Sequence, residues 1–511
     1  MNKIALAAGM FLVVAGRAPV ALAQTAATNA MALTLAQAEQ LALDQNPSIA
    51  HARLAGQAAS FMVAERLAAF SPVFSASLTQ RGQTNPATSQ LAGGQQQVTT
   101  DASSYVSGVT QALSWGGGRV SVDFSGNRTA TSNVFSTYNP SFSSGLTASI
   151  TQPLLRGFRF DATRNDVAQA QIGGDIAGLE LREQMATTLA GVRRAYWELV
   201  YTTDALATAR RSEALARQQL DDNRLRVELG TVAPVDIVES EAEAASRHQA
   251  VVQAEGDWRN AQVTLKQLMV ANASDPIWVA SILPVDRPDA APQPIDVRSA
   301  IAAALANRSD VQIARKGRQS TGATVRLLDD LRKPEVNLVA AYNLNGIGGT
   351  QILRDSGTLG STVVGTATGS YLDVLRSIGA LDYPTWTVGL NVTMPLGRRA
   401  SDAAYARAQI QQRQEDVQIQ ALELDVAAQI TRLAERIRNA EEMTRAAAAA
   451  RELAQKRLDA EAARRTAGLS TNFFVLQAQR DLAAAQTSEL QAQLGYRTAL
   501  VDFDLAQQAP A

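Results

Sequence analysis

The amino-acid sequence predicts an α+β protein of two similar halves, each of which combines amphipathic strands with long helices. Three observations carry this prediction. The same order of motifs occurs twice along the 511 residues. Proline-free helical patterns extend over roughly 65 residues, which corresponds to about 100 Å of α-helix. Strand-like segments alternate apolar and hydroxyl side chains with a period of two.

The N-terminus has the pattern of an export signal. Lys3 is followed by the apolar run Ile4–Gly16 and by the small residues Ala21–Ala23. This pattern predicts a signal peptide over residues 1–23, cleaved before Gln24; the alternative is a buried N-terminal helix. No later apolar run approaches the roughly 20 residues of a spanning helix. An exported chain that crosses a bilayer would therefore do so as a β-barrel.

Four markers recur in the same order in both halves. The marker pairs are Thr34 and Asp296, Pro72 and Pro334, Thr151 and Thr393, and Gly230 and Gly468. The first two pairs have the same spacing of 262 positions. Recurrence in order predicts an internal duplication. We expect a first repeat over residues 24–290, a second over 291–506 and a short tail over 507–511.

Each half is expected to contain two helices before the proline, then strands, a very long helix, a glycine-marked turn and another long helix. The first very long helix is predicted over residues 165–230, and apolar residues recur along it and its counterpart at helical spacing. These residues are Leu189, Val192, Tyr196, Leu199 and Leu206, and Ile419, Leu422, Val426, Ile430, Leu433 and Ile437. Such seams pack against neighbouring helices as in coiled coils, so we expect a rod or a tube wall.

The predicted strands have one apolar face and one hydroxyl-rich face. The apolar positions include Phe74, Ala76, Leu78, Leu146, Ala148, Ile150, Val388, Leu390 and Val392. Strands of about ten residues with this pattern suit a membrane barrel, and Tyr383 and Trp386 suit its interfacial girdle. A soluble sandwich with one wet face is the alternative. Four strands cannot close a barrel within one chain, so the barrel prediction requires several copies.

Composition excludes several classes of function. A net charge of −1 provides no global field for nucleic acid. The absence of cysteine excludes disulfides, thiol nucleophiles and cysteine-based metal sites. The only histidines, His51 and His248, lie in polar helical patterns, and neither a phosphate loop nor a nucleophile elbow is present. We expect no enzyme, no metal site and no cofactor.

The doubled motif order resembles the TolC-type outer-membrane efflux proteins over essentially the whole mature chain. The matching segments are "LTLAQAEQLALDQNPSI" from Leu33, its counterpart from Ile295, the two x-Pro-Leu strand ends, and the turns after Gly230 and Gly468. The resemblance implies a homotrimer in the outer membrane of a Gram-negative-type cell, in contact with its lipid. A shared β-barrel, with about four strands from each chain, would continue into a long periplasmic α-helical coiled-coil barrel.

The resemblance also implies a passive exit duct for small molecules. Its partners would be a periplasmic adaptor (a membrane fusion protein) and an inner-membrane transporter. The outer-membrane duct of a type I protein secretion system is an alternative with the same fold. An exported coiled-coil structural or adhesion protein is an alternative of another class, and it would form no detergent-dependent trimer.

The chain departs from the family pattern in three places. Residues 104–128 form a candidate extra hairpin, which would widen or decorate the barrel. Residues 346–383 form an insertion, expected to be an external loop with a helical piece at Ser370–Ile378. The second tip turn is apolar where the family tends to carry acidic residues.

The tip turns are the candidate site. The candidate entrance residues are Asp236, Glu239, Phe473, Phe474 and Gln477. In a threefold assembly each residue becomes a ring, acidic at Asp236 and Glu239 and apolar at the two phenylalanines, and Phe474 would narrow the entrance. The alternative is that both phenylalanines are core residues and that Asp236 caps the helix after Pro234. By resemblance alone, the adaptor would contact Gly230, Thr231, Val232, Gly468, Leu469 and Ser470.

Overall fold

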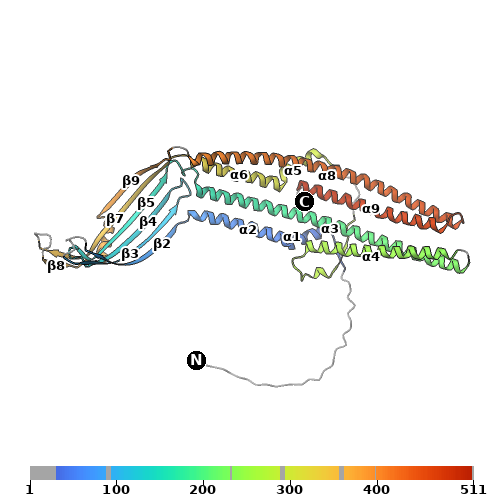
Figure 1. Ribbon diagram of the computed structural model, residues 1–511, viewed down its shortest axis with the longest axis horizontal. Coiled ribbons are helices and arrows are strands. Elements are labelled where there is room, and N and C mark those ends of the chain that lie inside the picture. The colour runs from blue at the N-terminus through green and yellow to red at the C-terminus, as the bar shows by residue number, and fades with distance from the viewer. Residues whose placement is uncertain are drawn as a thin grey trace, which may run out of the picture.

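The computed structural model describes residues 30–87, 94–230, 233–287, 294–355, 362–396 and 399–508. The signal peptide predicted over residues 1–23 lies outside the described residues. The molecule is elongated, with a β-sheet at one end and two long helical hairpins that reach their tips at the other end (Figure 1).

The first half passes through a short strand, two helices, four long strands and a helical hairpin. Its elements are β1 (Ala30–Leu33), α1 (Leu35–Gln45), α2 (Pro47–Leu67), the 3₁₀ turn η1 (Ala68–Phe70), β2 (Val73–Pro86), β3 (Gln97–Ala112), β4 (Arg119–Thr131), β5 (Tyr138–Pro153), α3 (Ala162–Glu228), α4 (Val235–Met269), the 3₁₀ turn η3 (Pro276–Trp278) and β6 (Ser281–Pro284). The short strands β1 and β6 pair in parallel beside the helices.

The second half has a similar order with fewer strands. Its elements are α5 (Val297–Asn307), α6 (Ser309–Asp330), β7 (Glu335–Arg354), β8 (Val363–Ala367), α7 (Tyr371–Gly379), β9 (Pro384–Thr393), α8 (Ala400–Thr466) and α9 (Asn472–Gln507). The expected sequence of helices, strands and hairpin is confirmed in both halves.

The markers of the sequence repeat coincide with the boundaries of elements. Thr34 and Asp296 are the N-caps of α1 and α5, and each helix has 11 residues. Each side chain accepts a hydrogen bond from a backbone N–H in the first turn, which would otherwise lack a partner. Pro72 and Pro334 directly precede β2 and β7. The helices α3 and α8 each have 67 residues.

The favoured count of four strands per chain is wrong, because the candidate hairpin joins the sheet. The antiparallel order is β2-β3-β4-β5-β7-β8, and β9 also pairs with β7. Gly116 and Gly117, with φ of 67° and 66°, allow the tight turn between β3 and β4. Both strands of this hairpin then satisfy their backbone hydrogen bonds on two sides. Six of the seven strands of this sheet have 10 to 20 residues, and five of these six are longer than the expected ten.

The insertion over residues 346–383 is more ordered than the expected loop. β7 continues through it to Arg354, and β8 pairs with the end of β7. The helical piece is confirmed as α7, with Ser370 as its N-cap. Among the described residues of the insertion, α7 and the segments that flank it lie between β8 and β9 and are not part of the sheet.

The two faces of the sheet differ in chemistry, as predicted. One row of paired residues crosses six strands through Phe74, Val109, Val122, Ala148, Tyr342 and Trp386. The adjacent row on the other face contains Ser75, Gly108, Asp123, Thr147, Asn343 and Thr385. We call these the apolar face and the polar face. Phe74 and Trp386 are 69% and 74% exposed, so the apolar face is not the core of a sandwich within this chain.

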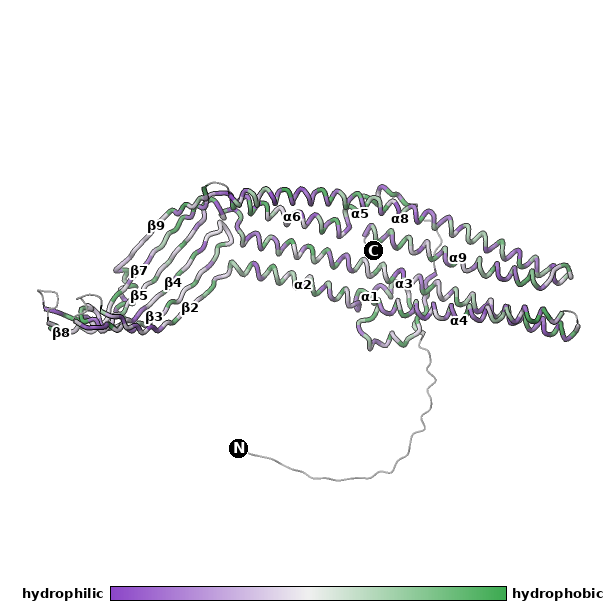
Figure 2. The backbone as a smooth tube through the Cα atoms, viewed as in Figure 1, coloured by the Kyte–Doolittle hydropathy of each residue, from purple (hydrophilic) through white to green (hydrophobic). Residues whose placement is uncertain are grey.

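Two buried clusters hold the helical part together. One packs α1 and the strands β1 and β6 against α3 and α4 around Val192, Tyr196 and Leu199. The other packs α5 against α8 and α9 around Ile430 and Ile437. These residues belong to the predicted seams. Figure 2 shows hydrophobic residues recurring along the helices and strands, interspersed with hydrophilic ones. Among the described residues, none of the helices combines the length and apolarity needed to cross a membrane.

The outermost helices of the wall leave apolar stripes exposed. Near the sheet, α2 packs on α3, α3 on α6, and α6 on α8, so α2 and α8 form the two edges. Leu54 and Phe61 are exposed on α2, seven residues apart, and Ile410, Val417 and Leu424 are exposed on α8 at the same interval. Seven residues are close to two helical turns, so each set forms one stripe along its helix.

Candidate functional site at the helical tips

Both helical hairpins turn at a glycine in the left-handed conformation. Gly230 follows α3 with φ of 71°, and Gly468 follows α8 with φ of 73°. A Cβ atom added at either glycine would have no other heavy atom within 4 Å. The backbone conformation, and not a close contact, therefore requires glycine at these positions.

The remaining candidate residues for adaptor contact surround these glycines. Leu469 is exposed at the second tip. Ser470 donates a hydrogen bond from Oγ to Glu461 Oε2 at 2.8 Å, which ties the turn back to α8. Thr231 and Val232 lie outside the described residues. Adaptor contact at these positions stays a prediction.

The two acidic candidates lie in the first turns of α4. Asp236 is half-buried and Glu239 is exposed. Pro234 occupies the N-cap position, and no side chain makes a capping hydrogen bond there. Asp236 is the acidic residue of the first turn of α4, and both its role at the entrance and the alternative capping role stay predictions. The carboxylate of Asp236 acts on Arg465 of α8, whose pKa it raises slightly against a larger lowering by burial and by Arg226.

The two phenylalanines extend from the first turn of α9. Phe473 and Phe474 are 54% and 51% exposed, so neither is a core residue within one chain. Their ring centroids lie 5.6 Å apart with an interplanar angle of 76°, an edge-to-face arrangement. One turn further along, Gln477 donates a hydrogen bond to Asp481 Oδ1 at 2.8 Å. Gln477 is thus held against its own helix, while the aromatic pair is available to other surfaces.

A buried polar cluster joins the two hairpins just above the tips. Asn223 of α3 is fully buried and donates to Ser240 Oγ of α4 at 2.7 Å. Its Oδ1 accepts hydrogen bonds from Gln219 at 3.0 Å and from Arg465 Nη2 of α8 at 2.9 Å. Asn472 of α9 accepts from Gln219 at 3.3 Å. Three helices from both halves therefore meet at the Asn223 amide, and Gln219 links the fourth helix, α9, to this cluster.

An ion-pair cluster makes a second link between the hairpins. Glu243 of α4 is buried and accepts hydrogen bonds from Arg247 Nε and from Arg480 Nε of α9, each at 2.7 Å. Burial raises the pKa of Glu243, but the hydrogen bonds from Arg480 and Arg247 lower it further, and the net shift is downward. The carboxylate is therefore held ionised.

The sequence prediction missed both links. The available signal was polar residues at positions where the helical pattern expects apolar ones, such as Asn223 and Ser240. Their partners lie up to 242 positions away in the chain, which a local pattern does not reveal.

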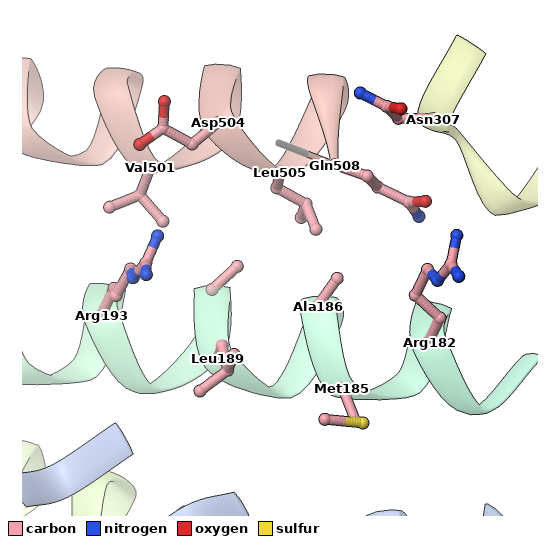
Figure 3. A pocket seen from close by; sticks show the side chains of 11 residues that line it. Arg182, Met185, Ala186, Leu189, Arg193, Asn307, Val501, Asp504, Leu505 and Gln508 are labelled. Atoms are coloured by element: carbon pink, nitrogen blue, oxygen red, sulfur yellow. The ribbon is translucent and has the colours of Figure 1, made fainter. Parts of the chain in front are cut away.

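A cavity lies farther up the wall, between α3 and α9. Figure 3 shows Arg182 and Arg193 extending from α3 toward Gln508 and Asp504 of α9, with Leu189 between them. Its volume is about 450 Å³. Among the described residues, no group of three or more His, Cys, Asp or Glu side chains is placed to hold a metal ion. The cavity is a gap between packed helices that is lined by two guanidinium groups. Its lining residues do not combine an acid, a base and a nucleophile.

A sheet with one exposed apolar face, joined to long helical hairpins with glycine tips, is the architecture of a TolC-type outer-membrane channel protein. Solved structures share it. A membrane protein from Pseudomonas aeruginosa superimposes with a TM-score of 0.65 at 16% identity, covering 93% of this chain and 90% of that chain. The CmeC outer membrane channel of Campylobacter jejuni has a TM-score of 0.62 at 15% identity, covering 93% and 87%.

The chain belongs to the outer membrane efflux protein family, whose model matches residues 107–270 and 300–506. It is also 27% identical over 351 residues to the outer membrane efflux protein BepC of Brucella suis biovar 1 (strain 1330), covering 67% of each chain. The family consists of channel proteins and not of enzymes.

Proposed function

We propose that three copies of this chain close into one tube that serves as the passive outer-membrane exit duct for small molecules. A periplasmic adaptor would dock at the tips, and an inner-membrane transporter would supply the energy. The observation that carries the proposal is the pair of exposed apolar stripes on the edge helices α2 and α8. Each stripe offers apolar side chains against which the other could pack, and both stay exposed among the described residues of one chain. Joining the edges of successive copies buries both stripes.

The internal duplication explains how three chains form a nearly sixfold wall. Each half supplies one pair of long helices near the tips and one pair near the sheet. The equal lengths of α3 and α8 and the matching caps of α1 and α5 support this origin. A ring of three chains would then present four helices from each chain, and twelve in total.

The stagger of the sheet supports closure into a barrel. Val73 and Glu335 begin β2 and β7 and are equivalent positions, so they lie at one height in a symmetric tube. The paired row that starts at Val73 reaches β7 at Ala341, six residues beyond Glu335. Six residues at about 3.3 Å each give a shift of about 20 Å along the strands. This shift accumulates over four strand spacings, which add up to about 19 Å across the sheet. The corresponding tilt of about 45° is close to that of outer-membrane barrels.

The extra hairpin matches the width of the sheet to the width of the helical wall. At this tilt each strand occupies about 7 Å of circumference, so six long strands span about 41 Å. Four helices at an interaxial distance of about 10 Å span about 40 Å. Four strands would span only about 27 Å at the same tilt. We therefore expect eighteen long strands in the trimer, with the polar face inside and the apolar face toward lipid.

The tips would form the periplasmic entrance. Phe474 and Phe473 would supply apolar rings that limit leakage by excluding water, and Asp236 and Glu239 would supply acidic rings. The exposure of the aromatic pair supports its availability to neighbouring copies.

The proposal is tested by measuring the mass of the mature protein in detergent together with its conductance in planar bilayers. We expect a trimer that conducts. Val417→Glu places a charge within the stripe of α8 and should dissociate the trimer. Gln411→Glu adds the same charge at an exposed position of α8 that lies about 120° around the helix from Val417, and it should leave the trimer intact. A monodisperse monomer of the unaltered protein, soluble without detergent, would reject the proposal.

A further inference from the structure

The short helix α7 lies across the apolar face of the sheet. Gly346 and Gly348 of β7 make room for it, since a Cβ atom on Gly346 would lie 2.7 Å from the Val374 carbonyl oxygen. A Cβ atom on Gly348 would lie 2.8 Å from Val374 Cγ2. Val374 and Ile378 are buried. The glycines belong to the same face as Leu344 and Tyr342, because side chains two residues apart share a face.

Aromatic contacts fix the start of the helix on this face. The Tyr371 hydroxyl lies 2.6 Å from Ser144 Oγ. The Tyr371 ring meets Phe142 and Tyr105 edge-on, with centroid distances of 6.0 and 6.3 Å. The helix is therefore packed on the sheet through its whole inner side and is not a free loop.

The pairing of β9 with β7 shows how far along the strands α7 lies from the long helices. β9 pairs with β7 over ten residues, from Thr393 opposite Glu335 to Pro384 opposite Leu344. Ten residues is the length that a tilted strand needs to cross the apolar part of a membrane. The contacts of α7 begin at Gly346, two residues beyond this span and on the side away from the long helices. Helix α7 thus lies at the outer margin of the apolar face.

The outward side of α7 exposes one large apolar side chain together with one ion pair, so it carries no surplus charge. Leu372 is 62% exposed, and Leu381, just after the helix, is also exposed. Asp373 and Arg376 pair with each other at 3.1 Å. Amphipathic helices of this kind lie in the plane of a membrane interface, with apolar side chains inserted at the boundary between headgroups and acyl chains.

We propose that α7 is an interfacial anchor that binds the lipid surface of the outer leaflet. This inference depends on the proposed membrane barrel. Leu372 and Leu381 insert at the headgroup–acyl boundary beside Trp386, the exposed aromatic residue on the apolar face at the same end of β9. The surface of α7 is continuous with the apolar face through Trp386, and the neutral pair on its outer side fits lipid better than a charged protein partner.

The absence of cysteine makes a clean test possible in the full-length protein. Single cysteines replace Leu372, Val388 and Asn345, and each variant is labelled with bimane and reconstituted in phosphatidylcholine vesicles. Quenching is compared among iodide in water, a nitroxide on the lipid headgroup and a nitroxide in the middle of the acyl chain. Val388 lies in the middle of the apolar side of β9, and Asn345 lies on the polar face near the level of α7.

We expect L372C to be quenched most by the headgroup nitroxide, V388C by the acyl-chain nitroxide and N345C by iodide. Lipid quenching of V388C together with quenching of L372C by iodide alone would place α7 in water and overturn this inference. Protection of L372C from all three quenchers would mean that protein covers the helix, which also overturns it. Loss of lipid quenching at V388C would instead reject the membrane barrel itself.

Discussion

The buried amide of Asn223 makes the sharpest prediction about the tips. Asn223→Ala removes the acceptor of Arg465 and the donor to Ser240 in a site from which water is excluded. The guanidinium of Arg465 already has its pKa lowered by burial and by Arg226, so the loss of an acceptor is costly. A buried hydrogen bond to a charged group contributes about 1.5–3 kcal/mol.

This loss acts on the contact between the two hairpins, because Asn223 joins helices from both halves. A change of about 1.5–3 kcal/mol corresponds to roughly a 13- to 150-fold increase in the population with separated tips. Hydrogen–deuterium exchange reads such local opening directly. Peptides covering residues 215–229 and 460–475 should exchange faster by about this factor, while the upper wall is unchanged.

Asp221→Ala is the matched control, because Asp221 lies two residues earlier on α3 and its side chain is 74% exposed. It should leave exchange at the tips unaltered. If Asn223→Ala exchanges at the rate of the Asp221→Ala control, the amide does not hold the hairpins together and the reasoning is refuted.

Three further predictions concern the wall and the entrance. Tyr196→Phe should lower the melting temperature, because the buried hydroxyl bonds Asp286 and the Leu33 carbonyl, at about 1–3 kcal/mol for groups left unpaired. The lowered pKa of Glu243 means that its stabilisation is present above the unfolded-state pKa and is lost as pH falls through the folded-state value. Melts across an acid titration should show this loss, and Glu243→Gln should lack it while being less stable at neutral pH. Phe474→Ala should raise single-channel conductance and antibiotic leakage. Each argument is rejected if its variant behaves like the unaltered protein. For Tyr196→Phe this means the same melting temperature, and for Glu243→Gln the same loss of stability in acid. For Phe474→Ala it means the same conductance.

The features that the sequence predicted well are those fixed by local chemistry. Thr34 and Asp296 cap helices through their own side chains, and Gly230 and Gly468 end helices through their own backbone conformation. The predicted start of the first very long helix, residue 165, differs from the observed one by three residues, because Asp161 caps α3. Such signals need no knowledge of the tertiary structure.

The features that the sequence predicted poorly depend on contacts with residues that are distant in the chain. Alternation in residues 104–128 identified the hairpin but not its place between β2 and β5, since strand order is set by pairing and not by the pattern of one strand. The insertion after Gly346 was expected to be an external loop with a helical piece because it contains Ser, Thr and several glycines. Here two of them make room for α7. The polar cluster at Asn223 was missed for the same reason, because its partners belong to other helices.

The central claim is that α2 of one copy packs against α8 of the next. The contact between α3 and α6 within one chain is its equivalent by the internal repeat. Inside one chain, Gln169 of α3 donates from Nε2 to the Ser320 carbonyl of α6 at 2.9 Å. Gly230 and Gly468 are 238 positions apart, and the same shift takes Gln169 to Arg407 of α8. The repeat spacing of 262 positions takes Ser320 back to Ala58 of α2, and both Arg407 and Ala58 are exposed on the edges of the wall. In a closed ring these two residues meet across neighbouring copies.

The most direct measurement is therefore cross-linking of the double variant Ala58→Cys, Arg407→Cys in native membranes with a short bismaleimide. Closure of the ring by α2 and α8 predicts a ladder of covalent dimer and trimer. The pair Ala58→Cys, Met443→Cys, whose second position is exposed but far down α8, should give none. A monomer band alone from the first pair, with both thiols shown to be reactive, would contradict the proposed assembly.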